Sequence, residues 1–155
     1  MSTYHTPVLL RESVEGLNIR PGGIYVDVTY GGGGHSAEIL RELGKGRLYA
    51  FDQDEDVTRH LPEDKRFYFI RGNFRYLRNY LRYEGVNRID GLLADLGVSS
   101  HHFNTPERGF TYRADAMLDM RMNRQAPLTA ETVINEYDPE RLTGLFRDYG
   151  DLREA

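Results

Sequence analysis

Hydrophobic residues follow two alternating patterns along this chain, one typical of strands and the other of helices. Short apolar, β-rich runs are expected to form four strands, at residues 24–28, 48–51, 67–70 and 89–94. Elsewhere apolar side chains recur every three or four positions, which is the spacing of an amphipathic helix. The expected helices lie at residues 8–17, 36–43, 74–81, 130–137 and 140–149. Residues 96–128 show neither pattern and are expected to form a loop.

Polar residues with the chemistry of helix caps stand before or at the start of three of these helices. Ser36, Asn73 and Asp138 can each accept a backbone N–H group that the first helical turn leaves unpaired. Pro139 is then expected to be the first residue of the last helix, and Gly150 its stop.

The alternation of strands and helices predicts an α/β fold with parallel strands and right-handed crossovers. Glycine-rich or acidic residues follow the strands, at the edge of the sheet where open α/β folds bind ligands. We therefore expect a nucleotide-like cofactor over a doubly wound, Rossmann-like sheet. Four strands are few for this class, and the last third of the sequence supplies none. The sheet is expected to be incomplete in this chain, with an exposed hydrophobic edge on its fourth strand that promotes self-association.

Four consecutive glycines, Gly31 to Gly34, follow the first expected strand. Such a run permits a tight turn and a close approach of the backbone to a ligand, and the helix that follows favours negative charge at its N-terminus. The dinucleotide fingerprint needs a third glycine where this sequence has Ser36. The stretch from Asp27 to Gly33 fits better the pattern acid-x-small-x-G-x-G. That pattern favours S-adenosylmethionine over a nicotinamide dinucleotide, because no pyrophosphate has to be cradled.

Two further strand ends carry candidate groups for the adenosyl part of such a cofactor. Asp52 ends the second strand, where a carboxylate can accept both ribose hydroxyls. Phe74 follows the third strand and can cover an adenine ring. The alternative for Asp52 is a cap of local backbone. The alternative for Phe74 is a place in the core, on a helix face shared with Leu77 and Leu81.

The loop after the fourth strand holds the candidate catalytic groups, Asp95 and Ser99. An exocyclic base amine is a poor nucleophile, since its lone pair is delocalised into the ring. A carboxylate or serine oxygen that accepts its N–H helps to localise that lone pair and holds the nitrogen in line with a sulfonium methyl group. His35 points at the same cleft, and neutral His101 or His102 can hydrogen-bond a cofactor or base. No metal site is expected, because adjacent histidines lack a carboxylate at ligand spacing.

Composition limits the classes of protein to which the chain can belong. Its 155 residues suit one domain, and 39% hydrophobic with 28% charged residues indicate a soluble globular chain. The longest apolar runs are far too short for a membrane span, the N-terminus has no secretory signal pattern, and there is no cysteine. We therefore expect a cytoplasmic protein without membrane contact. The net charge is −4, with the acidic excess in residues 131–155, so nucleic acid would have to be bound by local basic patches.

Five blocks of the sequence closely resemble the bacterial MraW/RsmH family of S-adenosylmethionine-dependent methyltransferases. They are His5–Leu10, Asp27–Ser36, Asp90–Ser100, Arg108–Phe110 and Leu118–Met122. The resemblance covers nearly the whole chain. It implies methylation of cytidine N4 in the 16S rRNA of the small ribosomal subunit, and a Rossmann-like class I methyltransferase fold with an inserted helical domain. Residues 1–105 would belong to the cofactor-binding domain, and residues 106–155 would hold a substrate loop and the beginning of the inserted domain.

The resemblance also implies cofactor contacts at matching positions, namely Gly33, Gly34, His35, Asp52, Phe74, Asp95 and His102. Many relatives have glutamine where this chain has His102. Because relatives are about twice as long, we expect this chain to be the N-terminal half of such an enzyme. The alternative function is a catalytically inactive fragment that binds S-adenosylmethionine or RNA.

Overall fold

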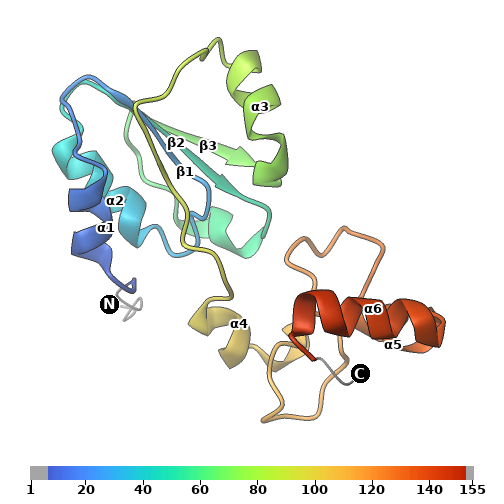
Figure 1. The fold of residues 1–155 in the computed structure, drawn as a ribbon. Coiled ribbons are helices and arrows are strands. Elements are labelled where there is room, and N and C mark those ends of the chain that lie inside the picture. The colour runs from blue at the N-terminus through green and yellow to red at the C-terminus, as the bar shows by residue number, and fades with distance from the viewer. Residues whose placement is uncertain (1–6, 153–155) are drawn as a thin grey trace. The chain divides into compact units, whose positions relative to one another are not determined.

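The computed structural model describes residues 7–152, apart from the side chains of Arg59 and His60. The chain divides into two compact units, Met1–Gly97 and Val98–Ala155, and each is described here by itself. The expected domain boundary after residue 105 stays a prediction. The elements of the first unit are α1 (Leu10–Gly16), β1 (Ile24–Asp27), α2 (Gly34–Glu42), β2 (Arg47–Asp52), the 3₁₀ turn η1 (Asp56–His60), β3 (Phe67–Arg71), the 3₁₀ turn η2 (Phe74–Tyr76), α3 (Leu77–Tyr83) and β4 (Gly91–Leu93). Figure 1 labels its helices α1 to α3 and its strands β1 to β3.

The first unit is built on a four-stranded parallel sheet with the strand order β3-β2-β1-β4. This confirms the α/β fold and the parallel pairing predicted from the sequence. The chain crosses from β1 to β2 and on to β3 in one direction, and then returns to place β4 on the other side of β1. The crevice at such a reversal is where ligands bind in doubly wound sheets. At this point Asp27 of β1 lies opposite Ala50 of β2 and Leu93 of β4.

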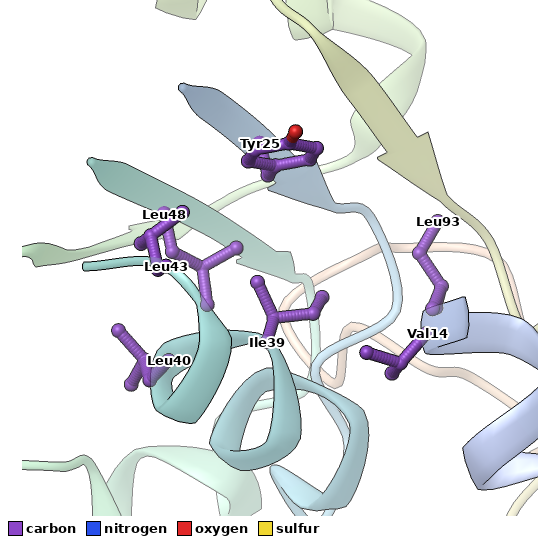
Figure 2. Close-up of a cluster of buried hydrophobic side chains, with 7 residues drawn as sticks. All are labelled: Val14, Tyr25, Ile39, Leu40, Leu43, Leu48 and Leu93. Carbon is purple, nitrogen blue, oxygen red and sulfur yellow. The ribbon is translucent and has the colours of Figure 1, made fainter. Parts of the chain in front are cut away.

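Helices cover both faces of the sheet, because successive strand residues point to opposite sides. On one face α1 and α2 pack against the sheet through a cluster made of Val14, Tyr25, Ile39, Leu40, Leu43, Leu48 and Leu93 (Figure 2). On the other face Leu81 of α3 and Val86 pack against the alternate strand residues Val26, Val28, Tyr49 and Phe51. The two central strands β1 and β2 are therefore mostly buried, and the carboxyl ends of all four parallel strands meet at one edge of the sheet.

Two expectations for the first unit are wrong in detail. Ser36 is not the cap of α2, because the helix already begins at Gly34 with Gly33 as its N-cap, and the Ser36 hydroxyl is used by Asp27 instead. Phe74 does not share the buried face of Leu81, since it lies in the 3₁₀ turn before α3 and is 41% exposed. The cap at Asn73 is confirmed, as its side chain accepts a hydrogen bond from the Arg75 N–H.

The second unit begins with the short helix α4 (Ser100–Asn104) and the 3₁₀ turn η3 (Pro106–Arg108). These turns lie inside the segment expected to be loop, so that prediction was wrong for residues 100–108. The helices α5 (Ala130–Glu136) and α6 (Pro139–Gly150) confirm the two helices predicted at the C-terminal end. The expected cap of α6 is confirmed as well, because the Asp138 side chain accepts a hydrogen bond from the Arg141 N–H.

The long connection between η3 and α5 is fixed by polar contacts. The Arg108 side chain is buried and donates to the carbonyl groups of Arg121 and Met122. Gly109 adopts a φ of 75°, and a side chain there would collide with the backbone nitrogen of Asp119. Arg121 pairs with Asp119 at 2.7 Å, and hydrogen bonds from Arg121 hold the pKa of that carboxyl at about 2. The connection is therefore an ordered structure rather than a free loop.

None of the helices in the described part of the chain is long and apolar enough to cross a membrane.

The edge strand β4 generates a prediction about self-association. Within residues 7–152 its far side pairs with no other strand, and Leu92 is 43% exposed. Unpaired strand edges recruit further strands, and a lysine on the edge opposes this. We expect the native chain to self-associate as its concentration rises, and Leu92→Lys to reduce that association. Light scattering after size-exclusion chromatography measures both. Leu96→Lys, which places the same charge on an exposed residue outside the strand, is the control; a native chain that stays monomeric contradicts the prediction.

Candidate functional site

Asp27, at the end of β1, is fully buried and organises the loop that follows it. One carboxylate oxygen accepts hydrogen bonds from the Thr29 N–H at 3.0 Å and the Thr29 hydroxyl at 3.3 Å. The other accepts from the Ser36 hydroxyl at 2.8 Å. Burial raises the pKa of this carboxyl, and the hydrogen bonds from Ser36 and Thr29 oppose the rise. The carboxylate thus ties the end of β1 to the first turn of α2.

The glycine loop is folded tightly over the ring of Tyr30. Gly33 adopts a φ of 76°, and a Cβ atom there would lie 2.7 Å from the Tyr30 hydroxyl. The Tyr30 ring is itself buried and packs against Phe67 and Phe69, with ring centroids 5.5 Å away in each case. Only glycine fits position 33 without moving this ring. The loop therefore presents bare backbone, followed by the first N–H groups of α2, which have no partner within the helix.

Asp52, at the end of β2, lies next to this loop. One of its carboxylate oxygens accepts a hydrogen bond from the Gly31 N–H at 2.8 Å, and the other accepts from the Asp54 N–H at 2.9 Å. This is the local capping role that the sequence left open as the alternative. These contacts leave acceptor capacity on the Asp52 carboxylate, because each of its oxygens can accept a further hydrogen bond. Asp52 is partly exposed and is available to a hydroxyl-bearing ligand.

Phe74 lies on the next strand end along the sheet. The loops after β2 and β3 are joined by a hydrogen bond from the Asn73 side-chain amide to Gln53 at 3.1 Å, and by one from the Gly72 N–H to the Asp52 carbonyl at 2.8 Å. These contacts place Phe74 beyond Asp52, with its ring partly open to solvent. Its exposure favours a ligand-covering role over the alternative role in the core.

Asp95 follows β4, on the opposite side of β1 from Asp52. Its backbone N–H donates to the Thr29 hydroxyl at 2.8 Å. Its side chain is 53% exposed, and one carboxylate oxygen lies 4.0 Å from Nδ1 of His35. The structure therefore brings Asp95 to the start of α2, beside the glycine loop.

His35 is buried in the first turn of α2, and its Nε2 atom has no hydrogen-bond partner among the described residues. Its other ring nitrogen, Nδ1, lies 4.0 Å from a carboxylate oxygen of Asp95. His35 was predicted to contact a cofactor. The geometry allows a contact through its backbone N–H or beside Asp95, and the contact itself stays a prediction.

Ser99 and His102 belong to the second unit, where they form a pair at the start of α4. Nδ1 of His102 accepts a hydrogen bond from the Ser99 N–H at 3.0 Å, and it lies 2.9 Å from the Ser99 hydroxyl. The His102 ring is buried against Phe110, with 5.0 Å between ring centroids. If the Ser99 hydroxyl donates to His102, its oxygen keeps lone pairs for an incoming N–H. The predicted contact of His102 with a cofactor stays a prediction.

Six of the predicted site residues thus lie along one edge of the sheet in the first unit, while two lie in the second. The six are Gly33, Gly34, His35, Asp52, Phe74 and Asp95. Sequence reasoning missed Thr29, which contacts both Asp27 and Asp95. The signal was the two-residue spacing from Asp27, which is typical of an Asx turn. No cluster of three or more metal-binding side chains exists among the described residues.

Comparisons with known proteins agree on one family. A sequence model of the MraW methylase family matches residues 2–155. A protein of Phocaeicola vulgatus named ribosomal RNA small subunit methyltransferase H is 60% identical over 98% of this chain, and 50% of its own length is covered. Proteins of the same name from Bacteroides fragilis and Porphyromonas gingivalis are 58% and 55% identical over 99% of the chain. The chain spans about half the length of these curated relatives.

The buried carboxyl of Asp27 generates a prediction about pH. Since its pKa is raised in the folded state, the folded chain holds this proton at pH values where the unfolded chain has released it. Stability therefore falls as pH rises from the unfolded pKa through the folded one. We expect the native chain to lose unfolding free energy relative to Asp27→Asn over this range. Urea denaturation from pH 4 to pH 7 measures the unfolding free energy of both chains, with the exposed Glu63→Gln as control. The prediction is contradicted if the native chain gains unfolding free energy relative to Asp27→Asn as the pH rises.

Proposed function

This chain belongs to the MraW methylase family, and from that membership we propose that it binds S-adenosylmethionine as part of a methyltransferase acting on small-subunit ribosomal RNA. The proposed acceptor is N4 of a cytidine in 16S rRNA. The observation that carries the proposal is the set of groups at the reversal of strand order. A bare glycine loop follows β1, Asp52 ends β2, and Asp95 follows β4.

The residues at this edge fit the parts of the cofactor one by one. The N–H groups of Gly34 and His35 open α2 and suit a carboxylate, because a helix N-terminus carries partial positive charge. Asp52 has acceptor capacity for the two ribose hydroxyls, and the exposed Phe74 ring suits the face of adenine. The absence of a side chain at Gly33 makes room for the Tyr30 hydroxyl, so the buried Tyr30 ring supports the loop backbone that is proposed to meet the ligand.

The bound cofactor would supply a methyl group on a positively charged sulfur, which needs no metal ion to react with a nitrogen. The role of the protein is to hold the acceptor nitrogen in the orientation that methyl transfer requires. In the proposed mechanism Asp95 accepts an N–H of the exocyclic amine, which localises the lone pair on the nitrogen, and then takes the proton that this nitrogen releases once it carries the methyl group. The Ser99 oxygen is the second proposed acceptor, with its own proton directed at His102. An acceptor of this kind holds the amine in the direction of attack, as in-line transfer demands.

Ribosomal RNA is the proposed partner, because curated relatives that the chain matches are named for the small ribosomal subunit. Such a role would place the protein in the bacterial cytoplasm with its substrate. A second candidate function is binding of the cofactor or RNA without turnover. The chain spans about half the length of the curated relatives that it matches.

The role of Asp52 is tested by its affinity for S-adenosylhomocysteine. We expect Asp52→Ala to weaken binding at least about tenfold, or about 1.4 kcal/mol, through loss of the ribose contacts. Asp52→Asn keeps one acceptor oxygen and should lose less. Titration calorimetry measures each affinity, and thermal melting shows whether the Gly31 contact also matters for folding. Glu63→Ala removes a charge elsewhere and is the control; an unchanged affinity in Asp52→Ala takes Asp52 out of the site.

The two candidate functions are separated by a methyl-transfer assay. Small ribosomal subunits from cells lacking the modification are incubated with the chain and with S-adenosylmethionine labelled in its methyl group. If the chain is a complete catalyst, label enters 16S rRNA, and Asp95→Asn reduces the rate at least about 100-fold because a proton acceptor is lost. Binding of S-adenosylhomocysteine without transfer of label supports the binding function. Absence of both contradicts the proposal as a whole.

A further inference from the structure

Asp95 is exposed and follows a strand of only three residues, so something besides the sheet must hold it still. The last backbone hydrogen bond between β1 and β4 runs from the Val28 N–H to the Leu93 carbonyl at 3.0 Å. Beyond it the next contact is made by a side chain, since the Asp95 N–H donates to the Thr29 hydroxyl at 2.8 Å. The hydroxyl thus takes the place of a backbone carbonyl and extends the pairing past the end of the strands.

The Thr29 hydroxyl is itself held by a hydrogen bond to the Asp27 carboxylate. It donates to the buried carboxylate of Asp27 while it accepts from Asp95, so its proton and its lone pair both have partners. The Thr29 N–H donates to the same carboxylate oxygen. The backbone of Asp95 is therefore connected through one threonine to a fully buried charge-bearing group.

The carboxylate of Asp95 faces a second side chain, His35. A neutral imidazole carries one N–H and one bare nitrogen. With the proton on Nε2, a buried N–H would have no acceptor among the described residues, and a lone pair would face the carboxylate. With the proton on Nδ1, the N–H is directed toward Asp95 and only a lone pair stays unpaired. The second arrangement avoids the cost of a buried unpaired donor.

From these contacts we propose that Thr29 and His35 are positioning residues for Asp95. Thr29 fixes its backbone nitrogen, and His35, protonated on Nδ1, restricts its carboxylate to one orientation. Nδ1 and the carboxylate oxygen lie 4.0 Å apart, and the proposed hydrogen bond requires a rotation of the exposed Asp95 side chain toward His35. The importance of this arrangement for methyl transfer rests on the proposed function, but the arrangement itself is a property of the ligand-free chain.

Nuclear magnetic resonance of the isotope-labelled chain without ligand tests the histidine part. We expect the Nδ1 resonance of His35 in the range of a protonated ring nitrogen, and a shift of that resonance in Asp95→Asn. Three-bond couplings should show one Asp95 rotamer in the native chain and in His35→Asn, whose amide nitrogen takes the place of Nδ1. They should show averaging in His35→Phe, which keeps a ring but has no donor. A proton on Nε2 alone, or one rotamer in His35→Phe, overturns this part of the proposal.

Hydrogen exchange of the Asp95 amide tests the threonine part. We expect Thr29→Val to lower its protection about tenfold or more, and Thr29→Ser to preserve it, because only the hydroxyl accepts the bond. Thr58→Val removes an exposed hydroxyl elsewhere in the unit and should leave this amide unchanged. Equal protection in Thr29→Val and Thr29→Ser overturns the role of the hydroxyl. Neither measurement requires a cofactor, so a chain that fails to bind S-adenosylhomocysteine refutes the proposed function and leaves this inference standing.

Discussion

The candidate site depends on one buried carboxylate. Asp27 stands where the strand order of the sheet reverses, and its carboxylate accepts the hydrogen bonds that Thr29 and Ser36 donate from the two sides of the next loop. A carboxyl group in this position is costly to bury unless its oxygens are satisfied. The donors that satisfy it come from both ends of the glycine loop. The same interactions that make burial of Asp27 tolerable therefore fix the loop that is proposed to meet the ligand.

Much of this arrangement could be predicted from the sequence, because strand ends in a parallel sheet share one edge. The alternation of apolar runs gave the parallel fold, and the positions of Asp52 and Asp95 after β2 and β4 followed from it. The helices α5 and α6 were predictable from the spacing of their apolar residues, and Asp138, a capping residue that acts locally, marked the start of α6. Features set by neighbouring residues in the chain are the ones that a single sequence reveals.

Features set by contacts between distant residues were not predictable in this way. Ser36 has the chemistry of a cap, but a buried carboxylate nine residues earlier uses its hydroxyl. Phe74 has the spacing of a core residue, but the 3₁₀ turn before α3 rotates it out of the buried face. The segment after Asp95 shows no periodic pattern, yet Arg108 orders it through carbonyl groups more than ten residues away. In each case a hydrogen bond or a local change of helix type outweighed the pattern.

The buried ring of Tyr30 has a consequence for the energetics of recognition. It lies beneath Gly33 and packs against two aromatic residues of β3, so the glycine loop is supported from within although its sequence is that of a flexible linker. A segment that is already ordered loses little conformational entropy when it binds a small molecule. The glycine loop is thus ordered despite its glycine content. Its conformational entropy is lost when the chain folds, and little more is lost when a ligand binds.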